Sequence, residues 1–238
     1  EIANRLYMGF VYHYERTEIE DSEKDGILES EDVPGSSTSM ASGIGLSLNL
    51  DTRDNAFLPT EGWLFEAGFE QTIGSFSYPR GEIDVRKYFL LRQRPDGSGR
   101  HVVSLSTRFG VTGHNTPVYD HYFAGGFSTI RGFYFRDASP LSDGVVVGGH
   151  TILLGSLEYL FPITADDTLR GVLFCDTGTV EPSLKDWNDK YRVAPGFGVR
   201  ITVPAMGPAP IALDFAFPIS KNPGDREQVF SFFIGFLR

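Results

Sequence analysis

Apolar and polar side chains alternate over most of this chain. In the segment 62–73, Trp63, Phe65 and Phe69 fall on one parity, while Glu66 and Glu70 fall on the other. A period of two is typical of a β-strand with two unlike faces, and Gly, Pro, Asp and Asn bound such segments. The pattern predicts ten strands, at 4–17, 38–51, 62–73, 78–93, 101–111, 151–161, 169–179, 192–203, 211–218 and 228–237.

The lengths of these segments and of their connections indicate a membrane barrel. Most run for about ten residues or more, the length that a tilted membrane strand needs, whereas soluble strands are typically shorter. Long or polar connections (18–37, 112–150, 180–191 and 219–227) alternate with short turns, and 74–77 is the exception. Long loops on one rim and short turns on the other are typical of outer-membrane proteins. We therefore predict an all-β, transmembrane, antiparallel up-and-down β-barrel.

Composition narrows the choice of partner. The chain has 238 residues, 20 of them Phe and 10 Tyr, and a net charge of -10. An acidic chain is a poor ligand for nucleic acid, because phosphate binding needs a basic face. One cysteine cannot form a disulfide framework or a structural zinc cluster, so we expect neither a metal nor a cofactor. Cys175 falls on the outward parity and is interpreted as a small wall residue.

The connection 112–150 carries the most unusual segment, "AGGFSTIRGFYFRD" at 124–137. Three glycines break it as a strand, and its apolar and aromatic residues are too many for a solvated loop. We expect this loop to fold into the barrel lumen, with its aromatic side chains against the inner wall. Glu158 and Asp176 lie on the inward parity of the next two strands, and the guanidinium of Arg131 can fork onto such carboxylates.

Several motifs together resemble the BamA/TamA superfamily of outer-membrane assembly and translocation barrels. The loop motif is Ile130–Phe133 ("IRGF"); the others are "LDTRDNAFLPTEGW" at 50–63, "PGFGVRITVPAMGPAPIALDFAFPI" at 195–219 and "FSFFIGF" at 230–236. The resemblance covers nearly the whole chain. It implies that Ile130, Arg131, Gly132 and Phe133 form a lumen loop motif whose arginine meets Glu158 and Asp176. It also implies a lateral seam at the last strand, formed by Phe230, Phe232, Ile234, Gly235 and Phe236.

The chain departs from the family pattern in size. The superfamily barrel has sixteen strands and follows periplasmic POTRA repeats, whereas ten strands and no POTRA-like repeat are found here. We interpret residues 1–238 as the C-terminal portion of such a barrel; a complete small barrel is the alternative. The chain also ends "GFLR", with Leu237 and Arg238 beyond the aromatic residue on which the family often ends.

The resemblance implies an outer-membrane location of the Gram-negative type and a role in assembling client barrels through the lateral seam. Unfolded outer-membrane protein clients, outer-membrane lipids and accessory lipoproteins are the partners it implies. A polypeptide-translocating pore of the two-partner secretion type and a passive porin are the alternatives, and the loop in the lumen argues against the porin.

Several other residues of the connections and strand ends suggest possible functions. Asp120, His121, His114 and His150 are candidates for rim catalysis, but no nucleophile elbow and no metal-binding histidine pair accompanies them, so we expect no enzyme activity. The acidic segment 17–37 lacks the spacing of a calcium loop and is interpreted as solvated. Tyr12, Tyr14, Trp63 and Phe217 are expected in an interfacial aromatic girdle.

Overall fold

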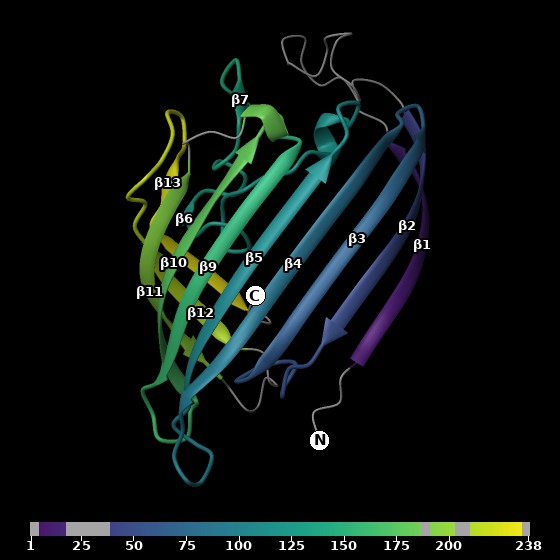
Figure 1. The fold of residues 1–238 in the computed structure, drawn as a ribbon. Helices are drawn as coiled ribbons and strands as arrows, with labels where there is room; N and C mark the ends of the chain where they lie inside the picture. Colours follow the sequence, from purple (N-terminus) through teal and green to yellow (C-terminus); the bar gives the residue numbers. More distant parts are fainter. Residues whose placement is uncertain (1–4, 18–38, 187–190, 203–209, 235–238) are drawn as a thin grey trace.

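Ten long strands form one antiparallel sheet in the computed structural model, which describes residues 5–17, 39–186, 191–202 and 210–234 (Figure 1). The strands are β1 (Arg5–Thr17), β2 (Ser39–Asp51), β3 (Gly62–Gly74), β4 (Tyr78–Arg92), β5 (His101–Thr112), β9 (Thr151–Pro162), β10 (Leu169–Glu181), β11 (Arg192–Ile201), β12 (Ile211–Ala216) and β14 (Phe230–Ile234). Each strand pairs with its neighbours in this order. The predicted all-β antiparallel architecture is confirmed, because each predicted segment corresponds to one of these strands.

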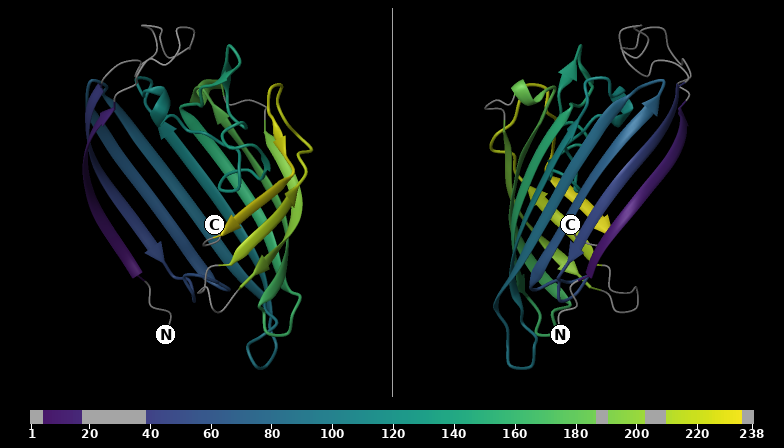
Figure 2. Two further views of the ribbon diagram at one scale, coloured as in Figure 1. Left: turned by 180° about the vertical axis from the view of Figure 1, so that it is seen from behind. Right: turned by 45° about the vertical axis from the view of Figure 1, so that its right-hand side comes forward.

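The sheet is tilted and curved, so that it has a concave and a convex face (Figures 1 and 2). Large apolar side chains stand exposed on the convex parity of strands across the sheet. They include Met8, Phe10, Leu46, Phe69, Phe89, Leu105, Leu157, Leu173, Phe197, Phe215 and Phe232. A continuous apolar outer band is what lipid-facing strands require. Tyr12, Tyr14, Trp63 and Phe217 are also exposed.

The two edges of the sheet are β1 and β14. β1 pairs with β2 over all 13 of its residues, and β14 pairs with β12 from Phe230 to Ile234, where the described range ends. Within the described residues no pairing joins β1 to β14, so the wall is open along this line. The predicted last strand, 228–237, is interrupted at Val229, and its residues 235–237 lie outside the described ranges.

The turn between β2 and β3 explains the "LDTRDN…PTEG" motif. Asp51 accepts two hydrogen bonds from the guanidinium of Arg53, at 2.9 and 2.8 Å. Asp54 accepts from the backbone N–H groups of Thr60 and Glu61 and from the Thr60 hydroxyl. Carboxylates that accept several backbone donors close a turn without further secondary structure.

The long connection from β5 to β9 lies on the concave side of the sheet (Figure 2). It holds η2 (Val118–Asp120), β6 (Gly132–Phe133) and the small hairpin of β7 (Leu141–Ser142) and β8 (Val145–Val146), more regular structure than the sequence indicated. Its residues Tyr122, Ala124, Ile130, Phe133 and Ala138 share a buried core with side chains of β9, β10 and β11. Among the described residues, no helix has the length and hydropathy of a membrane span.

Candidate functional site

Arg131 lies at the centre of the contacts that hold this loop. Its Nε and Nη2 atoms donate to the two carboxylate oxygens of Asp176, each at 2.8 Å, and its backbone N–H donates to Asp176 at 3.0 Å. Nη2 also lies 2.6 Å from Oε1 of Glu158. Asp176 belongs to β10 and Glu158 to β9, so one side chain ties the loop to two adjacent strands.

The site extends to two further strands. Nη1 of Arg131 donates to Oδ2 of Asp214, on β12, at 3.1 Å. The same carboxylate forms a second ion pair with Arg200 of β11, whose Nη2 donates to Oδ2 at 2.9 Å. Asp214 therefore bridges two guanidinium groups, and the network reaches all four strands from β9 to β12.

Nearly all of this network is dry. The side chains of Arg131 and Arg200 are 1% exposed and those of Asp176 and Asp214 are 0% exposed. Phe174 covers one face of the Arg131 guanidinium, with the ring centroid 3.5 Å from Cζ. Burial by itself would lower the pKa of Arg131, but the attraction of Glu158 and Asp176 outweighs it and raises the pKa. The guanidinium therefore keeps its charge. Removing one of its carboxylate partners would leave part of this buried charge uncompensated.

Two glycines make room for this arrangement. Gly132 has φ of +93°, a conformation that side chains other than glycine rarely adopt, and it turns the chain directly after Arg131. Gly198 lies opposite Asp214 in the β11–β12 ladder. A Cβ at Gly198 would overlap the Asp214 carboxylate and the backbone oxygen of Leu213. Gly132 of "IRGF" is thus required by its backbone conformation, and Gly198 of "GFGVR" is required by the close approach of Asp214.

The loop also contacts the last strand, β14, and the segment that directly precedes it. β6, within the motif, pairs with β13 (Glu227–Gln228), just before β14. Beyond the motif, the Tyr134 N–H donates to the Arg226 carbonyl at 3.1 Å. Phe127 stacks on Phe233 of β14, with ring centroids 4.5 Å apart and planes at 14°. The loop therefore lies between the charged network and the edge strand, in contact with both.

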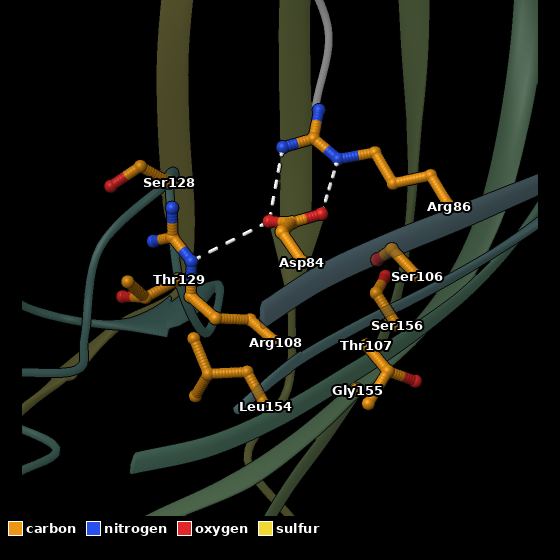
Figure 3. Close-up of a pocket in the computed structure, with 10 residues that line it drawn as sticks. All are labelled: Asp84, Arg86, Ser106, Thr107, Arg108, Ser128, Thr129, Leu154, Gly155 and Ser156. Carbon is orange, nitrogen blue, oxygen red and sulfur yellow. Dashed lines mark hydrogen bonds and ion pairs between the residues drawn. The ribbon is translucent and has the colours of Figure 1, made fainter. Parts of the chain in front are cut away.

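On the opposite side, the loop tip faces β4 and β5 across a polar cavity of about 60 Å³. Ser128 and Thr129 of the loop line it together with side chains of the wall, among them Asp84, Arg86 and Arg108 (Figure 3). Asp84 accepts from Nε of Arg86 at 2.9 Å. A polar cavity of this size has room for water, so the loop is buried around Arg131 and borders a mainly polar space at its tip.

The structure thus brings together Arg131, Glu158 and Asp176, which sequence reasoning had named, and it places Ile130 and Phe133 in the buried core. Sequence reasoning missed Asp214, Arg200, Phe174 and Phe233, and also Ser156, whose hydroxyl donates to Asp176 at 2.6 Å. The stacking of Phe127 on Phe233 agrees with the expectation that aromatic side chains of the loop lie against the inner wall. Inward parity was the available signal for the wall residues, since Asp214 alternates with Ala212 and Ala216. The partner of an inward side chain, however, depends on where the loop tip points, and no local pattern encodes that.

Two expectations about the loop motif need correction or restriction. Tyr134 and Phe135 are exposed, at 46% and 70%, and do not pack against the inner wall. Gly132 and Phe133 pair with β13, and the Tyr134 N–H donates to the Arg226 carbonyl, so the chain here follows the segment before β14. On the last strand, Phe230, Phe232 and Ile234 are exposed on the convex face; Gly235 and Phe236 lie outside the described residues.

The histidines sit together at the base of the loop. The rings of His121 and His150 are 4.5 Å apart, and those of His114 and His150 are 5.8 Å apart. The ring nitrogens of His121 face the carbonyl oxygens of Val147 and Thr116. Within the described ranges, no group of three or more His, Cys, Asp or Glu side chains is placed to hold a metal ion. The acidic segment considered as a calcium loop lies almost wholly outside those ranges.

Comparison with known proteins gives the following matches. The family model for the Omp85 superfamily domain matches residues 2–236. BamA, an outer membrane protein assembly factor of Nitratidesulfovibrio vulgaris, is 26% identical over 240 residues, which cover 96% of this chain and 29% of the relative. A SAM50-like protein of Schizosaccharomyces pombe is 26% identical over 208 residues, which cover 79% of this chain and 42% of the relative.

Among solved structures, BamA from Haemophilus ducreyi lacking POTRA domains 1-3 superposes with a TM-score of 0.76 and 19% sequence identity. The match covers 96% of this chain and 50% of that chain. This likeness supports the fold. The chain spans less than half the length of the two relatives described above.

Proposed function

The chain belongs to the Omp85 superfamily, and on that premise we propose that it forms part of the wall and the internal loop of a factor that inserts client β-barrels into the outer membrane. It is an outer-membrane barrel protein, and its relatives include proteins named for outer-membrane assembly and for sorting and assembly machinery. The clients would be unfolded outer-membrane polypeptides, with lipids and accessory lipoproteins as further partners.

One observation carries this proposal: within the described residues β14 is an edge strand with one neighbour, and the loop holds it from inside. β14 pairs with β12 on one side, and no described strand pairs with its other side, while the loop contacts Phe233 and pairs with β13. An edge strand presents free backbone groups that can template an incoming strand by β-augmentation. The loop would set the position of that edge without covering it.

The test is site-specific photocrosslinking in the full-length protein in native membranes, with an unfolded client barrel supplied. We place the crosslinker at Phe232, which is exposed on the convex face of β14, and at Leu157, equally exposed in the middle of the wall on β9. An insertase gives client adducts from Phe232 and none from Leu157. Equal yields from the two positions would contradict a role for this edge.

A third position separates the alternatives. Ser128 lies at the loop tip beside the polar cavity (Figure 3). A translocating pore would pass its polypeptide along the concave face and give adducts from Ser128 in place of Phe232. A passive porin would give no client adducts at any of the three positions, and would conduct ions without a client.

A further inference from the structure

Arg170 is buried without a partner. It lies near the first residue of β10, on the concave face, and is 2% exposed. Its Nε and Nη2 atoms are buried and have no hydrogen-bond partner. Burying an unpaired charge is costly, so native proteins rarely leave such a group unsatisfied.

The other buried arginines are paired. Arg131, Arg192 and Arg200 have exposures of 1–3%, and each forms an ion pair with at least one aspartate: Asp176 and Asp214 for Arg131, Asp225 for Arg192, and Asp214 for Arg200. Among the described residues, Arg170 alone of these four lacks a carboxylate within ion-pair distance. The fold therefore supplies counter-charges wherever it buries a guanidinium, except here.

The surroundings of Arg170 make its position more unusual. In the β10–β11 ladder, Arg170 lies directly opposite Arg200, an arrangement of like charges that destabilises a sheet. Nε of Arg200 and the hydroxyl of Thr202 are also buried without a partner. The nearby turn offers Asp167, but Arg100 and the Gly99 N–H already engage it, at 3.1 and 3.0 Å.

Four polar atoms on three side chains thus lack partners on adjacent strands: two on Arg170, one on Arg200 and one on Thr202. Arg170 also lines a cavity of about 30 Å³, together with Phe57, Tyr88, Leu160 and Glu158. This volume is enough for a water-sized species or a small ion. We propose that Arg170 binds a small monovalent anion, of the size of chloride or formate, in this cavity.

The chemistry of the site favours such an anion over a larger one. A guanidinium can donate to an anion through parallel N–H groups, and the hydroxyl of Ser104, on the cavity wall, can donate a further hydrogen bond. The small volume favours a small anion, and the carboxylate of Glu158 on the cavity wall disfavours a dianion. This inference is independent of the proposed assembly function.

The test uses bromide as the probe, on the purified protein in detergent. Crystals grown with sodium bromide should show an anomalous peak in the cavity beside Arg170. When bromide replaces gluconate at constant ionic strength, the melting temperature of the wild type should rise by roughly 2–4 °C. Arg170→Met should abolish both effects, while Arg94→Met, an exposed arginine on the same rim, should keep them.

Several results would overturn the site. They are the absence of an anomalous peak at Arg170 in the wild type, a peak that persists in Arg170→Met, or an equal bromide-dependent shift in wild type and variant. Formate should displace bromide from the site, since the two share charge and size. A carboxylate side chain of the full-length protein occupying the position would also contradict a free-anion site. The wild-type crystal decides the matter even if the variant fails to fold.

Discussion

The ring of Phe127, at the tip of the internal loop, lies stacked on the ring of Phe233, on the last strand, with centroids 4.5 Å apart. Phe233 is the large apolar side chain that β14 directs to the concave face, since Phe230, Phe232 and Ile234 are exposed on the other face. The stack therefore fixes one edge of the wall from inside.

Loss of this stack should loosen the edge strand. Phe233→Ala removes an aromatic contact worth about 0.5–1.5 kcal/mol beyond its buried area, so backbone amides of β14 should exchange with deuterium faster. Hydrogen–deuterium exchange by mass spectrometry measures this. Phe232→Ala, on the convex face, serves as the matched control. Equal acceleration in both variants would show that the stack does not hold the edge.

Arg131→Lys should release the loop although it keeps the charge. An ammonium group cannot donate in parallel to Asp176 while reaching Glu158 and Asp214. We expect faster exchange throughout 124–138 and easier proteolysis there. Arg136→Lys is the control, because the Arg136 side chain is exposed and lies over the rings of Phe123 and Phe135. A loop as protected in Arg131→Lys as in the wild type would contradict the pinning role.

Asp214→Ala should be severely destabilising, by about 3–5 kcal/mol, because it leaves Arg200 buried without a carboxylate. Replacing Arg200 by Met in the same chain should recover part of this loss, since the unpaired charge is then gone. Urea unfolding in lipid vesicles gives the four free energies of the double-mutant cycle. Additive losses would mean that the two side chains are not coupled.

Gly198→Ala tests the close approach of β11 and β12. The added methyl group would overlap the Asp214 carboxylate and the backbone of Leu213, and such overpacking costs about 1–3 kcal/mol. Gly68→Ala, in β3, is a matched control, because a Cβ there meets nothing within 4 Å. Comparable unfolding midpoints for the two variants would contradict the steric argument.

Because His121 is largely buried, we expect the stability of the protein to depend on pH. Burial lowers the pKa of His121 below its ordinary value of 6.5, and the hydrogen bond to the Val147 carbonyl offsets this only in part. As the pH falls through 6.5, His121 becomes protonated more readily in the unfolded chain than in the folded protein. The free energy of unfolding should therefore fall as the medium becomes more acidic. His121→Gln should flatten this dependence.

The measurement for His121 is the unfolding midpoint at pH 7.5 and at pH 5.5. His13→Gln provides the control, because His13 is on β1, far along the sheet from the loop. If the wild type and His121→Gln lose stability equally between the two pH values, another group is responsible.

The strands could be predicted from the sequence because an apolar outer face and a mixed inner face impose a period of two on every long segment. The same parity located Glu158 and Asp176. It did not identify Asp214 as a partner of Arg131, because that contact depends on the rotamer and the direction of the loop tip. The pairing of β6 with β13 left no signature at all, since it is made by backbone atoms, and it explains why Tyr134 and Phe135 are exposed.

The pairing of β6 with β13 has a consequence for how this region can vary. Because the backbone makes it, the identities of Glu227 and Gln228 can drift among relatives with little effect. The spacing between β13 and Phe233 cannot drift in the same way, since one insertion or deletion there would separate the ladder from the Phe127–Phe233 stack. Homologous sequences should therefore be variable in composition here but nearly constant in length.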